Sequence, residues 1–255
     1  MCLIAVALDA HPRYRLVLAA NRDEFHARPA APASWWDDAP QIFGGRDLQQ
    51  HGSWLAINRA GHWAAITNVR RMVPPDPQAP SRGALVADYL RGTQSAVDYA
   101  RVLQARPQRH AGYNLLLGDR AHVVYSSNTP QPAHRTLSPG VHAVSNASLD
   151  TPWPKLLRLR QALADWCAAG QDEFAPLFHA LSDTRSAADA ELPDTGVGLE
   201  MERFLAPPFI YGERYGTRCC TVLALDHDGR GLFHERRFGP NAAPQGETRE
   251  RLELA

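Results

Sequence analysis

The chain has 255 residues, of which 44% are hydrophobic, with 27 basic and 27 acidic side chains. This length allows a sizeable core in one large domain or two small ones. Because the formal net charge is zero and no basic run is longer than two residues, neither nucleic acid nor an anionic membrane is expected as a partner. A small-molecule substrate or ligand is expected instead, and the sequence leaves the oligomeric state open.

Targeting and metal-binding patterns are absent from the sequence. No apolar stretch is long enough for a transmembrane helix, and Asp9, His11 and Arg13 interrupt the first apolar run too early for a signal peptide. The four cysteines show no CxxC spacing and no disulfide framework, which predicts reduced thiols in a cytoplasmic protein. The eleven histidines show no HExxH pattern, so no metal site is expected.

The chain opens with two apolar runs, 2–8 and 16–20, joined by a short polar link. This pattern predicts a β-hairpin. In an antiparallel pair the start of the first strand lies beside the end of the second. Cys2 is therefore predicted to lie close to Asp23, which belongs to the polar tetrad Asn21-Arg22-Asp23-Glu24 after the second run.

A cysteine in second position has a specific chemical consequence. Methionine aminopeptidases act when the second residue is small, so we expect removal of Met1, which leaves a thiol and a free α-amine on Cys2. An α-amine with a pKa of about 8 can accept the proton of a thiol with a pKa of about 8.5 and act as a built-in general base. A carboxylate such as Asp23 could orient the resulting ammonium. The alternative is that Cys2 is an ordinary small apolar residue.

The segment 25–48 contains several prolines and the sequence Gly44-Gly45-Arg46-Asp47. It predicts an ordered loop rather than a linker, because its tryptophans, Trp35 and Trp36, need burial. Long loops inside compact domains are often binding loops.

The runs 53–57 and 62–68 flank an Asn- and Gly-bearing turn and predict a second hairpin. Asn68 closes its second strand, and taken alone it is a strand-ending turn residue.

The rest of the chain alternates between helical and extended patterns. Helices are predicted at 84–90, 95–104, 154–169 and 172–181, and strands at 114–117, 122–126, 141–145, 219–225 and 232–238. A loop is predicted at 182–198 and a flexible tail from about 240 to 255. Antiparallel hairpins interleaved with helix pairs indicate an α+β fold rather than a parallel βαβ sheet. No repeat or linker divides the chain, so a single domain over 1–255 is predicted.

The first run is apolar on both faces of the predicted strand, and a strand hidden on both sides needs cover on both sides. Two stacked antiparallel sheets with helices outside would provide that cover.

Four motifs in this order resemble the NRDE family, also called the transport-and-Golgi-organisation family. They are Met1-Cys2, Asn21-Arg22-Asp23-Glu24, Ser81-Arg82-Gly83 and Tyr215-Gly216-Thr217-Arg218. The family is similar to N-terminal-nucleophile (Ntn) hydrolases, especially the cysteine acylases that cleave penicillin V and conjugated bile salts. The resemblance covers nearly the whole chain and implies a four-layer αββα sandwich of two antiparallel sheets flanked by helix pairs.

The resemblance also implies a set of catalytic residues. In the similar acylases the cysteine is joined by an aspartate, two asparagines and an arginine. The matching positions here are Asp23, Asn68, Asn146 and Arg218, around Cys2.

Each residue type suits amide cleavage. The Asn68 amide would donate to the oxyanion of a tetrahedral intermediate, and Asn146 would orient the substrate or the amine. Arg218 would favour the thiolate of Cys2 by charge pairing, and Asp23 would hold the α-ammonium. Alternatively, Arg218 and Asp23 form a structural ion pair between two strands.

The chain departs from the acylases in one respect. Those enzymes usually carry an arginine a few residues before the aspartate, whereas Ala20 stands there in this chain and Arg22 adjoins Asp23. The residues predicted to contact substrate are Asn21, Arg22, Trp35, Trp36 and Trp54.

Two functions from different classes follow. The first is an Ntn-type cysteine amidohydrolase that cleaves a small-molecule amide through an acyl-thioester on Cys2, without a cofactor. The second is a non-catalytic carrier of haem or a small hydrophobic ligand on the same scaffold, because some family members are implicated in haem handling. The chain has no CxxCH motif for covalent haem attachment, so haem would have to enter an apolar cleft near the tryptophans.

Overall fold

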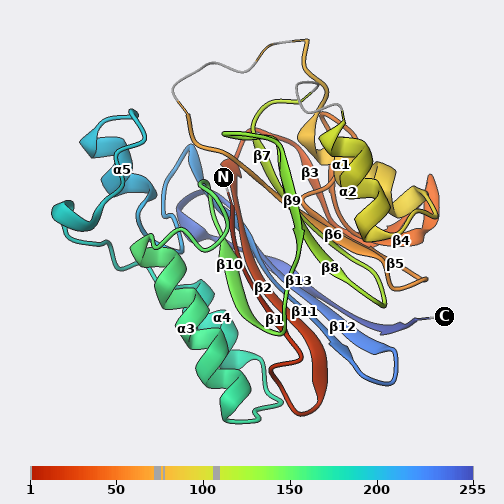
Figure 1. The fold of residues 1–255 in the computed structure, drawn as a ribbon. Helices are drawn as coiled ribbons and strands as arrows, with labels where there is room; N and C mark the ends of the chain where they lie inside the picture. The colour runs from red at the N-terminus through yellow and green to blue at the C-terminus, as the bar shows by residue number, and fades with distance from the viewer. Residues whose placement is uncertain (1, 72–75, 77, 106–109, 255) are drawn as a thin grey trace. The chain divides into compact units, whose positions relative to one another are not determined.

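A computed structural model describes residues 2–71, 76, 78–105 and 110–254. Within these residues the chain forms two antiparallel sheets, one of six strands and one of seven, together with α-helices (Figure 1). The α+β class predicted from the sequence is confirmed. Contacts divide the chain into a first unit (Met1–Ala27, Arg70–Val73 and Pro139–Leu252) and a second unit (Arg28–Val69, Pro74–Ser138 and Glu253–Ala255).

The first unit holds the six-stranded sheet, in the order β10-β1-β2-β11-β12-β13. Its elements are β1 (Cys2–Leu8), β2 (Tyr14–Phe25), β10 (Gly140–Val144), α3 (Pro154–Ala168), α4 (Ala175–Leu181), α5 (Leu199–Leu205), β11 (Tyr215–Asp226), β12 (Arg230–Phe238) and β13 (Pro244–Glu253). The helices α3 and α4 lie against one face of this sheet (Figure 1).

The core of the first unit forms between that face and the two helices. Side chains alternate along a strand, so every second residue of β1 and β2 faces the helices. Leu3 and Ala19 contribute from the strands, Leu159 and Leu163 from α3, and Phe178 from α4, all of them buried. Every residue of β1 after Cys2 is buried, as expected for a strand that is apolar on both faces.

The second unit holds the seven-stranded sheet, in which the strands follow one another in chain order from β3 to β9. Its elements are β3 (Ala30–Trp36), β4 (Ala39–Asp47), β5 (Leu55–Asn58), β6 (Trp63–Asn68), α1 (Arg82–Arg91), α2 (Ala96–Gln104), β7 (Tyr113–Gly118), β8 (Val123–Ser127) and β9 (Ala133–Thr136). Its core lies between α1, α2 and one face of this sheet.

The motif Ser81-Arg82-Gly83 starts α1. The Ser81 side chain accepts a hydrogen bond from the Gly83 amide at 3.2 Å and so caps the helix. The Gly83 carbonyl in turn accepts from the Ser53 amide at 3.1 Å, and a Cβ on Gly83 would lie only 3.0 Å from the Ser53 carbonyl oxygen. The glycine permits this close approach of two backbones.

The prediction of a loop at 25–48 is wrong, because the chain forms β3 and β4 there. The prolines of this segment are unfavourable in the interior of a sheet. However, β3 is an edge strand of its sheet, where Pro32 breaks no ladder between two neighbours. The pairing of β3 with β4 is also irregular, with register shifts between Ala31 and Ser34 and between Trp35 and Trp36. These irregularities conceal the period-two pattern.

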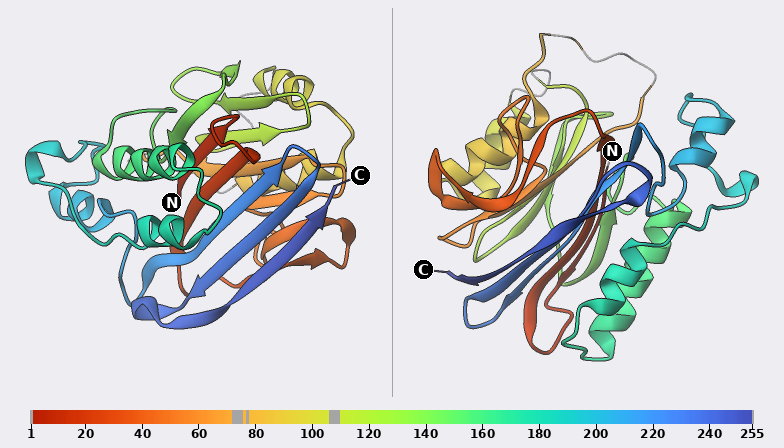
Figure 2. Two further views of the ribbon diagram at one scale, coloured as in Figure 1. Left: turned by 90° about the horizontal axis from the view of Figure 1, so that it is seen from below. Right: turned by 180° about the vertical axis from the view of Figure 1, so that it is seen from behind.

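The flexible tail predicted from about 240 is also wrong, because Pro244–Glu253 forms strand β13 at the edge of the first sheet, beside β12 (Figure 2). His234 on β12 contacts the Glu247 carboxylate at 3.1 Å, and Arg237 donates to the Thr248 hydroxyl at 2.7 Å. Charged residues are common on edge strands, so the polar sequence of β13 lacked the apolar alternation that marks a strand.

Within the described part of the chain, no helix is both long and apolar enough to span a bilayer. All four cysteines are free thiols.

Candidate active site

The candidate site lies at one end of the six-stranded sheet, where β1 begins and β2 ends. Cys2 pairs with Arg22 across the β1–β2 hairpin, and Arg22 pairs with Cys219 on its other side. Asp23 follows one step later and pairs with Thr217 of β11. The prediction that the hairpin brings Cys2 beside Asp23 is therefore confirmed.

The two faces of the sheet divide these side chains into two groups. Paired residues share a face and successive residues alternate, so Cys2, Arg22 and Cys219 lie on one face. Asp23 and Thr217 lie on the opposite face, the one that α3 and α4 cover.

Asp23 is held rigidly in this position. Its side chain is 1% exposed, and the Thr217 hydroxyl donates to its carboxylate at 2.7 Å. Burial raises the pKa of Asp23, while the positive charge of the amino terminus, the cations Lys155 and Arg70 and the hydrogen bond from Thr217 act in the opposite direction. The protonation of this carboxylate therefore depends on its cationic neighbours.

Cys2 is partly buried as a residue, and the pKa of its thiol lies above the ordinary value. Burial raises the pKa of this thiol, and the Asp23 carboxylate adds to the increase. The positive charge of the amino terminus, the Arg22 guanidinium and the Asp23 backbone amide act in the opposite direction and lower the same pKa. Arg22, which the sequence assigned to substrate binding, is thus one of the charges that act on the thiol.

Arg218 is the extra residue of a β-bulge between Thr217 and Cys219. Its Nη1 donates to the Phe25 carbonyl at 2.9 Å. Burial lowers the pKa of Arg218, and the neighbouring positive charge of Arg22 lowers it further. Arg218 is not among the main influences on the pKa of the Cys2 thiol, whereas Arg22 is.

Asn146 follows β10, the strand that pairs with β1 on the side opposite β2. β10 ends at Val144, which pairs with Ile4, and the next residue, Ser145, donates its hydroxyl to the Cys2 carbonyl at 3.1 Å. Asn146 is 1% exposed, and its carbonyl accepts a hydrogen bond from the Arg70 amide at 2.8 Å.

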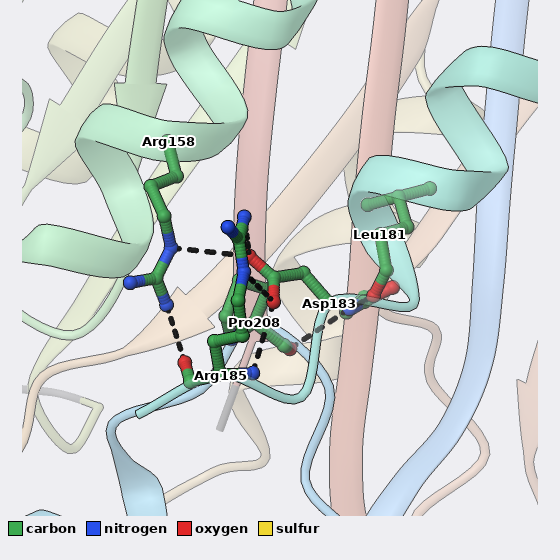
Figure 3. A network of polar contacts seen from close by, with 6 residues as sticks. Arg158, Leu181, Asp183, Arg185 and Pro208 are labelled. Carbon is green, nitrogen blue, oxygen red and sulfur yellow. Dashed lines mark hydrogen bonds and ion pairs between the residues drawn. The ribbon is translucent and has the colours of Figure 1, made fainter. Parts of the chain in front are cut away.

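Asn21 has a structural task rather than the predicted contact with substrate. Its side-chain amide donates to the carbonyls of Leu181 and Pro208 at 2.7 and 2.9 Å. Figure 3 shows these two residues beside Asp183, whose carboxylate pairs with Arg158 of α3 at 3.1 Å. Both amide hydrogens of Asn21 are therefore used in fixing the end of α4 and the segment before β11.

The other residues predicted for the site, namely Asn68 and the three tryptophans, belong to the second unit. Asn68 ends β6, pairs with Tyr113 and is partly buried. Trp36 is a core residue, 3% exposed, whose ring nitrogen donates to the Gly44 carbonyl at 3.0 Å. Its predicted role in substrate binding is therefore wrong.

Trp35 and Trp54 are partly exposed in the second unit. The Arg59 guanidinium lies 3.9 Å from the centre of the Trp35 ring, a cation–π contact. Trp54 lies against the backbone of Gly45, where a Cβ would come within 2.1 Å of its ring.

A group of buried charges near Asp23 was not predicted from the sequence. Lys155 is 3% exposed in the first turn of α3, and its ammonium donates to the Leu205 carbonyl at 2.9 Å. Arg70 and Glu202 form a buried ion pair. The available signal was helical spacing, because Lys155 precedes the buried Leu159 and Leu163 by one and two turns on the same stripe.

A cavity of about 10 Å³ lies among these groups, lined by Arg70, Trp153, Lys155, Glu202 and Leu205 among others. This volume is at the lower limit of the space that one water molecule needs.

Comparison with protein families gives a match over residues 1–240 to "Transport and Golgi organisation 2". The Transport and Golgi organization protein 2 homolog of Homo sapiens is 32% identical over 272 residues, which cover 98% of this chain and 97% of that protein. The Mus musculus homolog is 31% identical over 270 residues, which cover 97% of each chain.

Two solved structures resemble the fold. An N-acylethanolamine-hydrolyzing acid amidase ortholog of Caenorhabditis elegans matches with a TM-score of 0.53 and 11% identity, over 88% of this chain and 92% of its own. A mutant of the conjugated bile acid hydrolase of Clostridium perfringens matches with a TM-score of 0.56 and 9% identity, over 100% of this chain and 92% of its own. This likeness confirms the Ntn-hydrolase-like fold.

Proposed function

Because this chain belongs to the Transport and Golgi organisation 2 family and has an Ntn-hydrolase-like fold, we propose that it is a cysteine amidohydrolase. It cleaves the C–N bond of a small-molecule amide through an acyl-thioester on Cys2. The observation that carries the proposal is the partly exposed Cys2 at the first position of β1, with Arg22 paired to it and Asp23 adjacent. The names of the two structural neighbours, both hydrolases and one an amidase, support the same class of reaction.

The first half of the reaction acylates Cys2. After removal of Met1, which lies outside the described residues, the α-amine of Cys2 takes the thiol proton. The thiolate then attacks the amide carbonyl carbon and forms a C–S bond, and the carbonyl π electrons move to oxygen. As the intermediate collapses, the C–N bond breaks, and the ammonium returns the proton to the leaving nitrogen.

The second half restores the enzyme. The α-amine takes a proton from water, the hydroxide oxygen attacks the thioester carbon, and the C–S bond breaks. The ammonium gives its proton to the departing thiolate, so the products are a carboxylic acid, the free thiol and the neutral α-amine.

The protein groups have separate tasks in these steps. Asp23 holds the α-ammonium in place, and the charge of Arg22 favours the thiolate over the thiol. Asn146, on the β10 side of Cys2, orients the amine or the substrate. Asn68 remains the expected donor to the oxyanion, a role that comes from the family resemblance alone.

Alkylation with iodoacetamide tests the nucleophile. At pH 8 Cys2 should react about 10-fold or more faster than Cys167, because Cys2 is partly exposed, whereas burial raises the pKa of Cys167 to about 11 and leaves about one thiol in a thousand ionised. Cys219 and Cys220 are buried with raised pKa values and should also react slowly. Peptide mapping after brief exposure measures the four rates.

The control for this experiment is Cys2→Ala, which should lose the fast adduct and keep the slow ones. Equal rates at Cys2 and Cys167 in the folded wild-type chain would contradict a nucleophilic role for Cys2.

The carrier alternative has less support from the tryptophans. Trp36 and Trp63 are 3% and 0% exposed and lie inside the second unit. Only Trp35 and Trp54 of the proposed apolar cleft keep surface for a ligand. Saturable haem binding that persists in Cys2→Ala would favour the carrier.

A further inference from the structure

A pocket of about 580 Å³ in the first unit is lined by residues of α3, of α4 and of the segment that follows α4. Its polar lining comes from Arg158 of α3, from His179 of α4 and from the four residues 182–185. Pockets that bind small molecules usually have volumes of about 300–1,000 Å³. The pocket is therefore large enough for a small organic molecule.

One carboxylate at this pocket holds two guanidinium groups. Arg185 donates to both carboxylate oxygens of Asp183 at 2.9 Å, and Arg158 pairs with the same carboxylate at 3.1 Å (Figure 3). Burial raises the pKa of Asp183, but the hydrogen bonds and charges of the two arginines outweigh burial and hold this pKa below its usual value. The ionised carboxylate thus fixes both arginines at the pocket.

The charges around the pocket do not cancel. Among the lining residues, all of which the structure describes, Asp183 provides the one carboxylate against two guanidinium groups. One positive charge is therefore left over at the pocket. Arg203 on α5 is a useful contrast, because this arginine donates to both oxygens of Asp189 in a one-to-one pair.

Several hydrogen-bond donors at the pocket are unused within the described part of the chain. The contacts of Arg158 and Arg185 involve Nε and Nη2 of each side chain, which leaves Nη1 of each for another acceptor. The side chains of His179, Ser182 and Thr184 are exposed and make no hydrogen bond to the described residues. A phosphate group, with three strong acceptor oxygens and a charge of about −1.5 to −2 near pH 7, suits these donors and the excess positive charge.

The carbonyl end of α4 opposes an anion only weakly. The last carbonyls of a helix carry partial negative charge. In α4 they are covered, because the Ser182 amide donates to the carbonyls of Phe178 and His179 at 3.0 and 3.1 Å, and the Asp183 amide donates to the Ala180 carbonyl at 3.4 Å. The guanidinium groups therefore dominate the charge that a ligand meets.

We propose that this pocket binds a small molecule that carries a phosphate monoester group. The phosphate takes hydrogen bonds from Nη1 of Arg158 and Arg185 and from the hydroxyls of Ser182 and Thr184. The rest of the ligand lies over the apolar part of the lining, which consists of Ala162, Pro176 and Ala180. The binding site is independent of the proposed reaction, because it shares no residue with the group around Cys2.

Titration of the full chain with phenyl phosphate, followed by 1H–15N NMR spectra at constant ionic strength, tests the site. This probe joins a phosphate monoester to an apolar ring. The backbone amide signals of Thr184 and Arg185 should shift and reach saturation. Inorganic phosphate should shift the same signals with an affinity about threefold or more weaker, because it has no apolar part to bury.

Arg185→Gln should weaken the binding of phenyl phosphate by about 10-fold or more, because it removes a charge-assisted hydrogen bond. The Arg185 side chain is 78% exposed, so this variant should fold. Arg158→Gln should have a similar effect on binding, and Arg185→Lys should keep part of the affinity because the charge remains. Arg203→Gln is the matched control, because Arg203 pairs with a carboxylate outside the pocket, and it should change the affinity by less than about twofold.

Three results would overturn the proposal. If the Thr184 and Arg185 signals show no saturable shift, the arginines form a purely structural network. If Arg203→Gln weakens binding as much as Arg185→Gln does, the chain attracts anions without a specific site. If inorganic phosphate binds as tightly as phenyl phosphate, the site takes the free ion and the organic ligand is wrong. None of these results depends on whether Cys2 is reactive.

Discussion

Substitution of Cys2 by alanine is expected to lower the rate of amide cleavage by about 10³-fold or more, because the attacking atom is lost. The measurement is the release of fluorescent amine from a short-chain N-acyl aminocoumarin, with enzyme in excess over substrate. Cys2→Ser should also be strongly impaired, because a hydroxyl is a far weaker nucleophile than a thiol near neutral pH.

The matched control is Cys167→Ala, which removes a thiol from the buried side of α3. It should keep the wild-type rate and lose some stability, because it leaves a small cavity in the core of the first unit. Turnover by Cys2→Ala at the wild-type rate would show that the sulfur of Cys2 is not the nucleophile.

Substitution of Glu202 by alanine is expected to lower the free energy of unfolding by about 3–5 kcal/mol, the usual effect of removing one partner of a buried ion pair. The side chains of Arg70 and Glu202 are 5% and 3% exposed, so the guanidinium would remain buried without its carboxylate. Thr195 would lose its hydrogen bonds to Glu202 as well. Urea unfolding followed by tryptophan fluorescence measures the change.

Glu200→Ala is the control, because Glu200 is exposed on the same short helix and should change stability by no more than about 0.5 kcal/mol. The double variant Arg70→Met/Glu202→Leu should recover much of the loss, since apolar groups can replace a buried pair at little cost. If Glu200→Ala and Glu202→Ala lowered the free energy of unfolding equally, the buried ion pair would contribute no more to stability than an exposed carboxylate does.

The parts of the fold that were predictable are those defined by local pattern. The hairpin from Cys2 to Phe25 has two apolar runs of sufficient length, and its pairing follows from the alternation of side chains. Ser95 caps α2, as its position before a helical run predicted. The edge strands β3, β9 and β13 escaped detection, because an edge strand tolerates proline, charge and irregular register.

The site was only partly predictable, because some of its contacts join distant segments and have no local sequence pattern. The family motifs located Cys2, Asp23 and Asn146, and pairing in the sheet brings them to one end of the first unit. The β-bulge at Arg218, which turns its guanidinium to the Phe25 carbonyl, has no local signal in the sequence. The cluster of Lys155, Arg70 and Glu202 joins segments far apart in the chain, and no motif links them.

The proposed mechanism requires a free amine at Cys2, because that amine is the base that activates the thiol. Mass spectrometry of the intact chain, expressed without an amino-terminal tag and purified, tests this requirement in one step. We expect a mass that lacks Met1, with Cys2 as the first residue. A mature chain that retains Met1 would leave the thiol without its base, and the proposed mechanism would then be wrong.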